Sequence, residues 1–142
     1  MRHKVDGRLF GRPANQRKAL LRGLVTALLD NQRIETTVAK AKETKRIAER
    51  MITFGIKGDL HSKRQVLSYI TDRSVVSKLF NEIAPRFAGR NGGYLRVIQT
   101  RNRLKDSAPM AVVEFIDYDS IKQAKGKAKK DSKEEKSAKK ES

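Results

Sequence analysis

The densest concentration of side chains that could bind or react lies in residues 85–103, which read PRFAGRNGGYLRVIQTRNR. This stretch holds five arginines, three glycines and two aromatic residues. Guanidinium groups match the geometry of phosphates, and aromatic rings can stack on unpaired bases. We therefore interpret the stretch as a surface that meets the phosphates and unstacked bases of a nucleic acid.

The two aromatic residues of this stretch also have a structural interpretation. Phe87 follows an apolar helical stripe that contains Phe80 and Ile83, and this pattern favours packing in the core over base stacking. Tyr94 begins a predicted strand beside two glycines, and for this residue both roles remain open. The glycines can shape a tight helix-to-strand turn, and the same turn can let backbone N–H groups approach a phosphate. On this interpretation the stretch is a phosphate-binding corner.

The sequence contains no pattern that indicates catalysis or metal binding. There is no cysteine, and the two histidines, His3 and His61, lie far apart, so neither a thiolate site nor a histidine-based triad is indicated. The run from Gly89 to Gly93 lacks the spacing of a P-loop, and it follows a predicted helix where that motif follows a strand. We therefore expect a protein that is not an enzyme and that uses no cofactor, metal ion or small-molecule substrate.

The charge of the chain points to a polyanionic partner. The 33 basic and 16 acidic residues give a formal net charge of +17, and the sequence pI is near 10.5. The central residues 19–118 are themselves basic, with 18 basic against 10 acidic residues. Nucleic acid is the first candidate partner and an anionic membrane surface the second. No apolar run approaches the ~18 residues that a membrane-spanning helix needs, and the absence of cysteine fits a cytosolic protein.

Hydrophobic periodicity divides the middle of the chain into helices and strands. Apolar residues at helical spacing predict helices at residues 16–30, 38–54, 60–70 and 74–84. We expect Asn15 to cap the first helix, Asp59 the third and Asp72 or Ser74 the fourth, and we expect Pro85 to end the fourth. Runs rich in β-branched and aromatic residues predict strands at 33–36, 94–101 and 110–118, and the last two would form a hairpin.

These elements predict an α+β fold. Their order, α-β-α-α-α-β-β, fits a two-layer α/β domain whose helices cover one face of a small three-stranded sheet. The other face of the sheet must then meet water or a partner. The predicted organisation is a basic N-terminal arm at 1–13, a globular RNA-binding domain at 14–118, and a lysine-rich tail at 119–142 whose composition predicts disorder.

The candidate RNA-binding residues form four sets. Cations spread over an arm, helices, loops and a sheet favour irregular folded RNA, because a DNA-reading helix gathers its readout residues on one face. A solvated terminus is the alternative for the arm, and a solvated helix face is the alternative for the cations of the second helix. The candidates are Arg2, His3, Lys4, Arg8 and Arg12 in the arm; Arg17, Lys18 and Arg22 in the first helix; Lys42, Arg46 and Arg50 in the second; and Arg86, Arg90, Arg96, Arg101 and Arg103 on the main surface.

Four blocks of the sequence resemble one known family. MRHK at 1–4, TTVAKAKE at 36–43, KLFNEIAPRFAGRNGGY at 78–94 and APMA at 108–111 resemble the bacterial large-subunit ribosomal protein L17 family in order and spacing. The resemblance covers residues 1–118 and implies a structural, cytoplasmic, ribosome-bound protein with the same order of elements. It also implies contacts with large-subunit ribosomal RNA and neighbouring ribosomal proteins, near the nascent-chain exit tunnel. A DNA-binding protein and a phosphate-handling enzyme that depends on His61 or Glu82 are the rival hypotheses.

Overall fold

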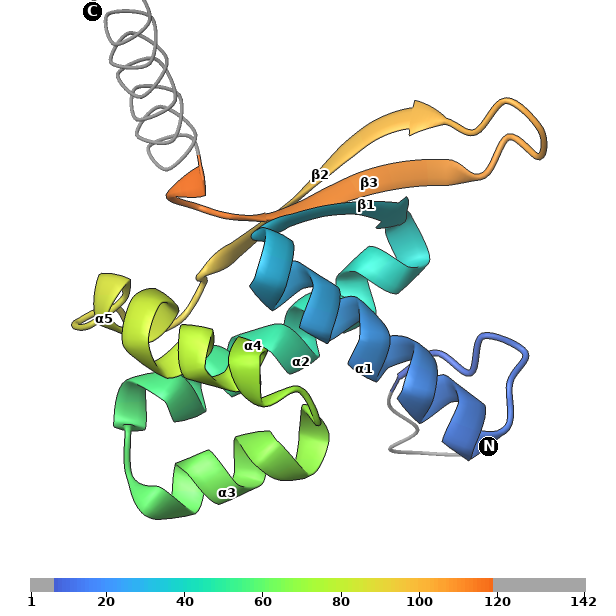
Figure 1. The fold of residues 1–142 in the computed structure, drawn as a ribbon. Helices are drawn as coiled ribbons and strands as arrows, with labels where there is room; N and C mark the ends of the chain where they lie inside the picture. Colours follow the sequence, from blue (N-terminus) through green and yellow to red (C-terminus); the bar gives the residue numbers. More distant parts are fainter. Residues whose placement is uncertain (1–6, 119–142) are drawn as a thin grey trace, which may run out of the picture.

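The computed structural model describes residues 7–118 and confirms the predicted α+β fold and the order of its elements (Figure 1). A small sheet lies over a layer of helices, and α4, η1 and α5 follow one another as a single helical segment. The predicted tail at 119–142 and the first six residues of the arm lie outside the described residues. The elements are α1 (Ala14–Asn31), β1 (Arg33–Thr37), α2 (Val38–Lys57), α3 (Leu60–Tyr69), α4 (Arg73–Lys78), η1 (Leu79–Ile83), α5 (Ala84–Arg86), β2 (Leu95–Asn102) and β3 (Pro109–Phe115).

The sheet is antiparallel, with the strand order β1-β3-β2. β2 and β3 form the predicted hairpin, with Leu95 opposite Phe115, while β1 pairs with the other edge of β3, with Thr36 opposite Ala111. Because side chains alternate between the two faces of a strand, Ala111, Val113 and Phe115 all point toward the helices, where they are fully buried. The prediction that the helices cover one face of the sheet is therefore confirmed.

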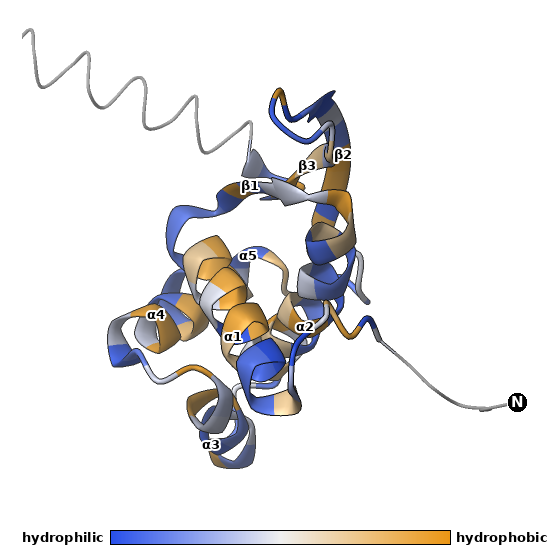
Figure 2. Ribbon diagram, turned by 90° about the vertical axis from the view of Figure 1, so that its right-hand side faces the viewer, coloured by the Kyte–Doolittle hydropathy of each residue, from blue (hydrophilic) through white to orange (hydrophobic). Residues whose placement is uncertain are grey.

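The core lies between the sheet and the helices α1 and α2. Val25, Leu28 and Leu29 of α1 and Ile52 of α2 have no exposed surface. Figure 2 shows the apolar, orange parts of the ribbon gathered in α1 and the middle of the domain, whereas the loop between β2 and β3 is mostly blue and hydrophilic. This arrangement keeps the apolar residues inside and leaves the surface to the charged ones.

The fourth helical segment continues past Pro85, so the expectation that this proline ends it is wrong. The N–H of Ala84 donates to the carbonyl of Leu79, five residues earlier, and this bond widens η1 into a π-type turn. The widening places Pro85 in the first turn of α5, where its missing N–H interrupts no helical hydrogen bond. The helical path therefore reaches Arg86 and places Phe87 against the core.

Two of the three predicted helix caps are confirmed and one is wrong. The expectation for Asn15 is wrong, because Pro13 occupies the cap position of α1 and no side chain caps this helix. Asp59 caps α3 as expected, since its Oδ1 accepts a hydrogen bond from the Ser62 N–H at 3.0 Å. Asp72 caps α4 in the same manner. The start of α3 is therefore held by a titratable group.

The cap at Asp59 predicts how stability depends on pH. Hydrogen bonds from Ser62, first from its hydroxyl and then from its backbone N–H, hold the pKa of Asp59 below its ordinary value. Such a group stabilises the fold above its unfolded-state pKa of about 3.9, and the contribution is lost as the pH falls through the folded-state pKa. An Asp59→Asn chain keeps the accepting oxygen but does not titrate, so its thermal unfolding midpoint should fall less steeply than that of the wild type below about pH 4. Parallel profiles for the two chains across the acid range would contradict this assignment.

Candidate nucleic-acid interface

The described part of the N-terminal arm and the cation row of α2 lie on one surface. Gly7 lies beside Glu43, and a hollow of about 250 Å³ between the arm and α2 is lined by Gly7, Glu43, Arg46, Ile47 and Arg50. The arm therefore reaches the cations Arg46 and Arg50 of α2 at Gly7. Arg8, Arg12 and Lys42 are also exposed, whereas Arg2, His3 and Lys4 lie outside the described residues.

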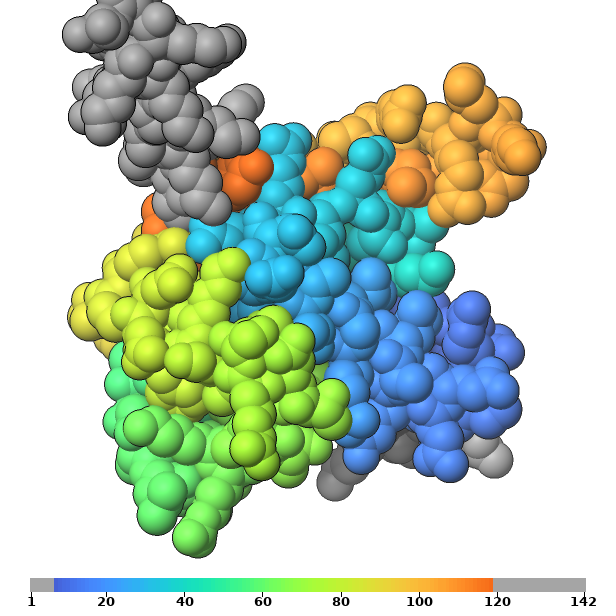
Figure 3. All heavy atoms as spheres, viewed as in Figure 1, coloured from blue at the N-terminus to red at the C-terminus, as the bar shows by residue number. Residues whose placement is uncertain are grey.

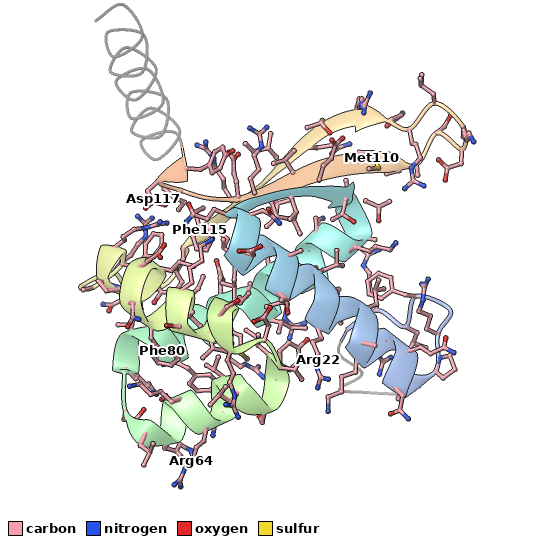
Figure 4. The ribbon with its side chains drawn as sticks, in the orientation of Figure 1. Arg22, Arg64, Phe80, Met110, Phe115 and Asp117 are labelled. Carbon is pink, nitrogen blue, oxygen red and sulfur yellow. The ribbon has the colours of Figure 1, made fainter. Side chains whose placement is uncertain are left out.

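The cations at the start of α1 divide into exposed and packed groups. Lys18 is exposed, while Arg17 and Arg22 are half-buried. The guanidinium of Arg22 lies over the ring of Tyr69, 5.8 Å from its centroid, and Figure 4 shows Arg22 between α1 and the α3–α4 segment. Burial raises the pKa of the Tyr69 hydroxyl, and the charge of Arg22 partly opposes that shift. Arg22 therefore packs α1 against α3, in addition to the binding role predicted for it.

The outer face of the sheet carries two arginines that flank one carboxylate. Glu114 of the central strand β3 is only 3% exposed, and its register partners are Arg33 on β1 and Arg96 on β2. The Nε atoms of Arg33 and Arg96 lie 3.4 and 2.6 Å from its two oxygens. A buried carboxylate is tolerated when it is paired in this way. The Tyr118 ring lies against Arg33 at 5.4 Å.

Arg86 and Arg90 have different environments, although both were predicted for the main surface. Arg86 forms a bidentate pair with Asp117, with Nε–Oδ2 at 2.8 Å and Nη2–Oδ1 at 3.0 Å. Its guanidinium also lies over the ring of Phe115, and Figure 4 shows Asp117 and Phe115 beside α5. Arg90 is exposed and donates from Nε to the carbonyl of Gly92 at 3.1 Å. Arg86 is therefore anchored to Asp117, whereas the guanidinium of Arg90 contacts only the turn that carries it.

The two aromatic residues of residues 85–103 are part of the core. Phe87 is 5% exposed and Tyr94 is 3% exposed, and their rings meet edge to face at 5.4 Å. Phe87 also stacks on Phe115 at 5.7 Å, and the Tyr94 hydroxyl donates to the carbonyl of Arg90. The core assignment of Phe87 is therefore confirmed, and the hypothesis that either ring stacks on bases is wrong. Tyr94 instead fixes the glycine-rich turn that presents Arg90.

The arginines of residues 85–103 do not form one corner. Arg90 precedes β2, whereas Arg101 and Arg103 lie at its other end, roughly 25 Å away for an eight-residue strand. Arg96 lies between them on the outer face of the sheet. The strand itself separates the candidates, so the stretch supplies contacts along an extended line.

Several cations beyond the predicted set are also exposed. Arg33 on the sheet and Lys105 in the β2–β3 loop were missed, because strand register and loop position are not visible in local patterns. Lys63 and Arg73 line a groove of about 620 Å³ beside Leu67, Val76 and Phe80. The only signal for these residues in the sequence is the overall excess of basic side chains.

Within residues 7–118 the structure offers no arrangement for metal binding, since no group of three or more His, Cys, Asp or Glu residues is gathered in space. His61 is exposed on α3 and contacts Gln65 of the same helix at 2.8 Å. Over the same residues, no helix is both long and apolar enough to cross a membrane. The arrangement can bind anions through guanidinium and ammonium groups on the surface of a folded domain.

Comparisons with known proteins converge on one family. Residues 20–116 match the family described as Ribosomal protein L17. The chain is 68% identical to Large ribosomal subunit protein bL17 of Thermodesulfovibrio yellowstonii, over 83% of this chain and 89% of the relative. It is 61% identical to the protein of the same name from Symbiobacterium thermophilum, over 75% of this chain and 95% of that relative. For Desulfotalea psychrophila the identity is 53%, over 84% of this chain and 92% of the relative.

Proposed function

Because the chain belongs to the ribosomal protein L17 family, we propose that it binds large-subunit ribosomal RNA through contacts between its Arg and Lys side chains and phosphates. It is a structural protein of the large ribosomal subunit, it is not an enzyme, and it resides on ribosomes in the bacterial cytoplasm. Neighbouring large-subunit proteins are its further partners. A position near the nascent-chain exit tunnel is part of the proposal and is based on the family resemblance.

The observation that carries the proposal is the distribution of cations over the folded domain. Exposed basic residues occur beside the arm, along α2, on the outer face of the sheet, in the turn before β2 and at the tip of the β2–β3 hairpin. Within the described domain α2 carries one row of them, but the others lie on the arm, the sheet, the turn and the hairpin tip, whereas a DNA-reading helix would gather its readout residues on one face. Irregular folded RNA presents phosphates in many directions, and this arrangement fits such a partner.

The predicted residues are not all proposed to contact RNA equally, because some are already paired within the fold. The arm at 1–13 would follow the phosphate backbone beside α2, and the globular domain at 14–118 would contribute Lys18, Arg90, Arg101 and Arg103. Arg86 and Arg22 already have partners within the fold, so we assign them mainly to positioning. Arg96 shares Glu114 with Arg33 on the outer face of the sheet, so we assign part of its charge to holding that carboxylate and keep it as a predicted RNA contact.

Sedimentation of the chain with ribosomal particles tests the proposal. At low salt the protein should travel with large subunits, and concentrated salt should release it, because phosphate contacts weaken as counterions compete. Recovery of the protein mainly in the free pool, or bound to DNA at low salt, would contradict the proposal and favour the DNA-binding alternative.

Replacement of Arg90 by Glu separates binding from folding. We expect Arg90→Glu to weaken RNA binding by roughly 10- to 100-fold, the equivalent of one charge-assisted hydrogen bond. The slope of log affinity against log salt concentration should become smaller in magnitude by about one, because one phosphate contact is lost. Its thermal unfolding should stay close to that of the wild type, because the side chain is exposed and donates only to a nearby carbonyl. Arg86→Glu is the matched control and should destabilise the fold, since it places two acids together at Asp117. A large loss of stability in Arg90→Glu would show that Arg90 is structural.

A further inference from the structure

The tip of the β2–β3 hairpin projects beyond the helical layer. Figures 1 and 3 show this end of the hairpin clear of the helices, and β1 ends where Thr37 pairs with Met110. The pairing between β2 and β3 shifts there, because Gln99 faces Ala111 while Asn102 faces Pro109. Two residues of β2 therefore oppose one of β3, a bulge that turns the strand and redirects its side chains.

The loop at this tip is fixed by its own hydrogen bonds. The Arg103 N–H donates to the carbonyl of Ala108 at 2.9 Å, and the Ser107 N–H donates to the carbonyl of Arg103 at 2.8 Å. Ser107 has a φ of 52°, an unusual value for a residue with a side chain. The Asp106 carboxylate accepts a hydrogen bond from the Ala108 N–H at 3.3 Å. These bonds hold the backbone of the loop in one conformation, which sets the directions in which its side chains leave the tip.

That surface combines an apolar centre with a cationic rim. A hollow of about 290 Å³ is lined by Arg101, Arg103, Leu104, Lys105 and Met110. Leu104 is 95% exposed, and Figure 2 shows an orange segment within the otherwise blue loop. Met110 lies on β3 toward this end, as Figure 4 shows, and its sulfur accepts a weak contact from Arg103. The apolar side chains of Leu104 and Met110 lie together with three cations at this hollow, and this combination is complementary to a partner that has an apolar face and negative groups.

The cations of the rim are available to such a partner. Arg101 is 73% exposed and lies 3.7 Å from Glu35, and Arg103 lies 3.5 Å from Asp106. Exposed ion pairs of this kind contribute little, so a phosphate can replace the carboxylate at small cost. A lipid surface would need a wider apolar area than one leucine and one methionine provide.

We propose that the hairpin tip binds an unpaired RNA base, with Leu104 and Met110 against the base and Arg101, Arg103 and Lys105 on its flanking phosphates. The faces of all bases are apolar, so this site recognises an extruded base by its position in the folded RNA and not by its identity. The inference rests on the proposed function and adds to the phosphate contacts an apolar contact with one extruded base.

Replacement of Leu104 by Ser tests the site in the full-length chain. We expect its dissociation constant for large subunits stripped of this protein by concentrated salt to rise about tenfold, equivalent to about 1.4 kcal/mol. The salt dependence of binding should not change, because no charge is altered. Leu60→Ser on α3 is the matched control, since Leu60 is 64% exposed and lies outside the tip, and its affinity should equal that of the wild type.

Chemical probing of base accessibility in the rebound subunits identifies the occupant. At saturating protein, a small set of unpaired bases should be protected by the wild type and by Leu60→Ser but reactive with Leu104→Ser. An unchanged affinity together with unchanged base reactivity would overturn the inference while leaving the proposed function intact. Weaker binding without any change in base reactivity would also overturn it and would identify a protein neighbour as the occupant. A wild-type chain that fails to rebind stripped subunits would contradict the proposed function itself.

Discussion

Raising the salt concentration from 50 to 200 mM is expected to weaken binding of this chain to large-subunit RNA by about 10³- to 10⁵-fold, if about six to ten of its cations contact phosphates. The described domain exposes cations on several sides, including Arg12, Lys42, Arg90, Arg101 and Lys105, so that number of contacts needs no rearrangement of the fold. Each contact releases bound counterions from the RNA, and added salt opposes this release. The effect is therefore large even though no single contact is strong.

The measurement is the dissociation constant at several salt concentrations. The logarithm of affinity should fall linearly with the logarithm of salt, with a slope of roughly −4 to −9 for this number of contacts. A neutral solute at the same osmotic strength serves as the control and should leave the affinity nearly unchanged. A flat salt profile would contradict binding through phosphates, and equal affinity for duplex DNA at every salt concentration would favour the DNA-binding hypothesis.

The fold was largely predictable, because most of its elements are specified by local patterns. Periodicity of the apolar residues located the helices, and the run of β-branched residues after Pro109 located the central strand. The position of β1 beside β3 was not predictable, since residues 33–37 and 110–114 are far apart in sequence and pair only in the folded chain. The Arg33–Glu114–Arg96 rung depends on that register and could not be inferred.

The segment around Pro85 shows where a correct local rule gives a wrong result. Proline disfavours helical geometry in the residue before it, so a helix end at Ala84 was the local expectation. The π-type turn at Leu79–Ile83 changes the hydrogen-bonding pattern ahead of the proline, and the buried side chains of Leu79 and Ile83 hold it in place. Tertiary packing therefore overrides the local preference, and a single sequence gives no measure of that packing.

The candidate interface was predictable as a charge pattern but not residue by residue. The excess of basic residues pointed to a polyanion, and the arginine-rich stretch gave the main candidates. Arg86 and Arg90 look equivalent in the sequence, yet Arg86 forms a bidentate pair with Asp117 whereas Arg90 donates only to the nearby carbonyl of Gly92. That difference arises because the chain beyond β3 returns to α5, a contact between residues 31 apart.

Replacement of Leu79 by Ala should be among the most destabilising single changes in the domain, with a loss of roughly 2–5 kcal/mol in the free energy of unfolding. Leu79 begins the π-type turn and has no exposed surface. Truncation removes its contacts and leaves a cavity that the neighbouring helices can fill only in part. Urea denaturation measures the loss, and Leu60→Ala on α3 is a control whose side chain is 64% exposed and should cost no more than about 0.5 kcal/mol. RNA binding by the folded fraction should be unchanged.

A double substitution tests why Leu79 matters at this position. Gly55 of α2 lies so close to the π-type turn that a Cβ there would stand 3.3 Å from Leu79 Cγ and 3.2 Å from Ala84 Cβ. In the wild type, Gly55→Ala gains about 1 kcal/mol of helix propensity but must displace these neighbours. In the Leu79→Ala chain the added methyl meets one neighbour fewer and fills part of the cavity. Gly55→Ala should therefore be more favourable in that background, by a coupling of about 0.5–3 kcal/mol. Additive effects would mean that the close approach of α2 to the π-type turn does not depend on Leu79.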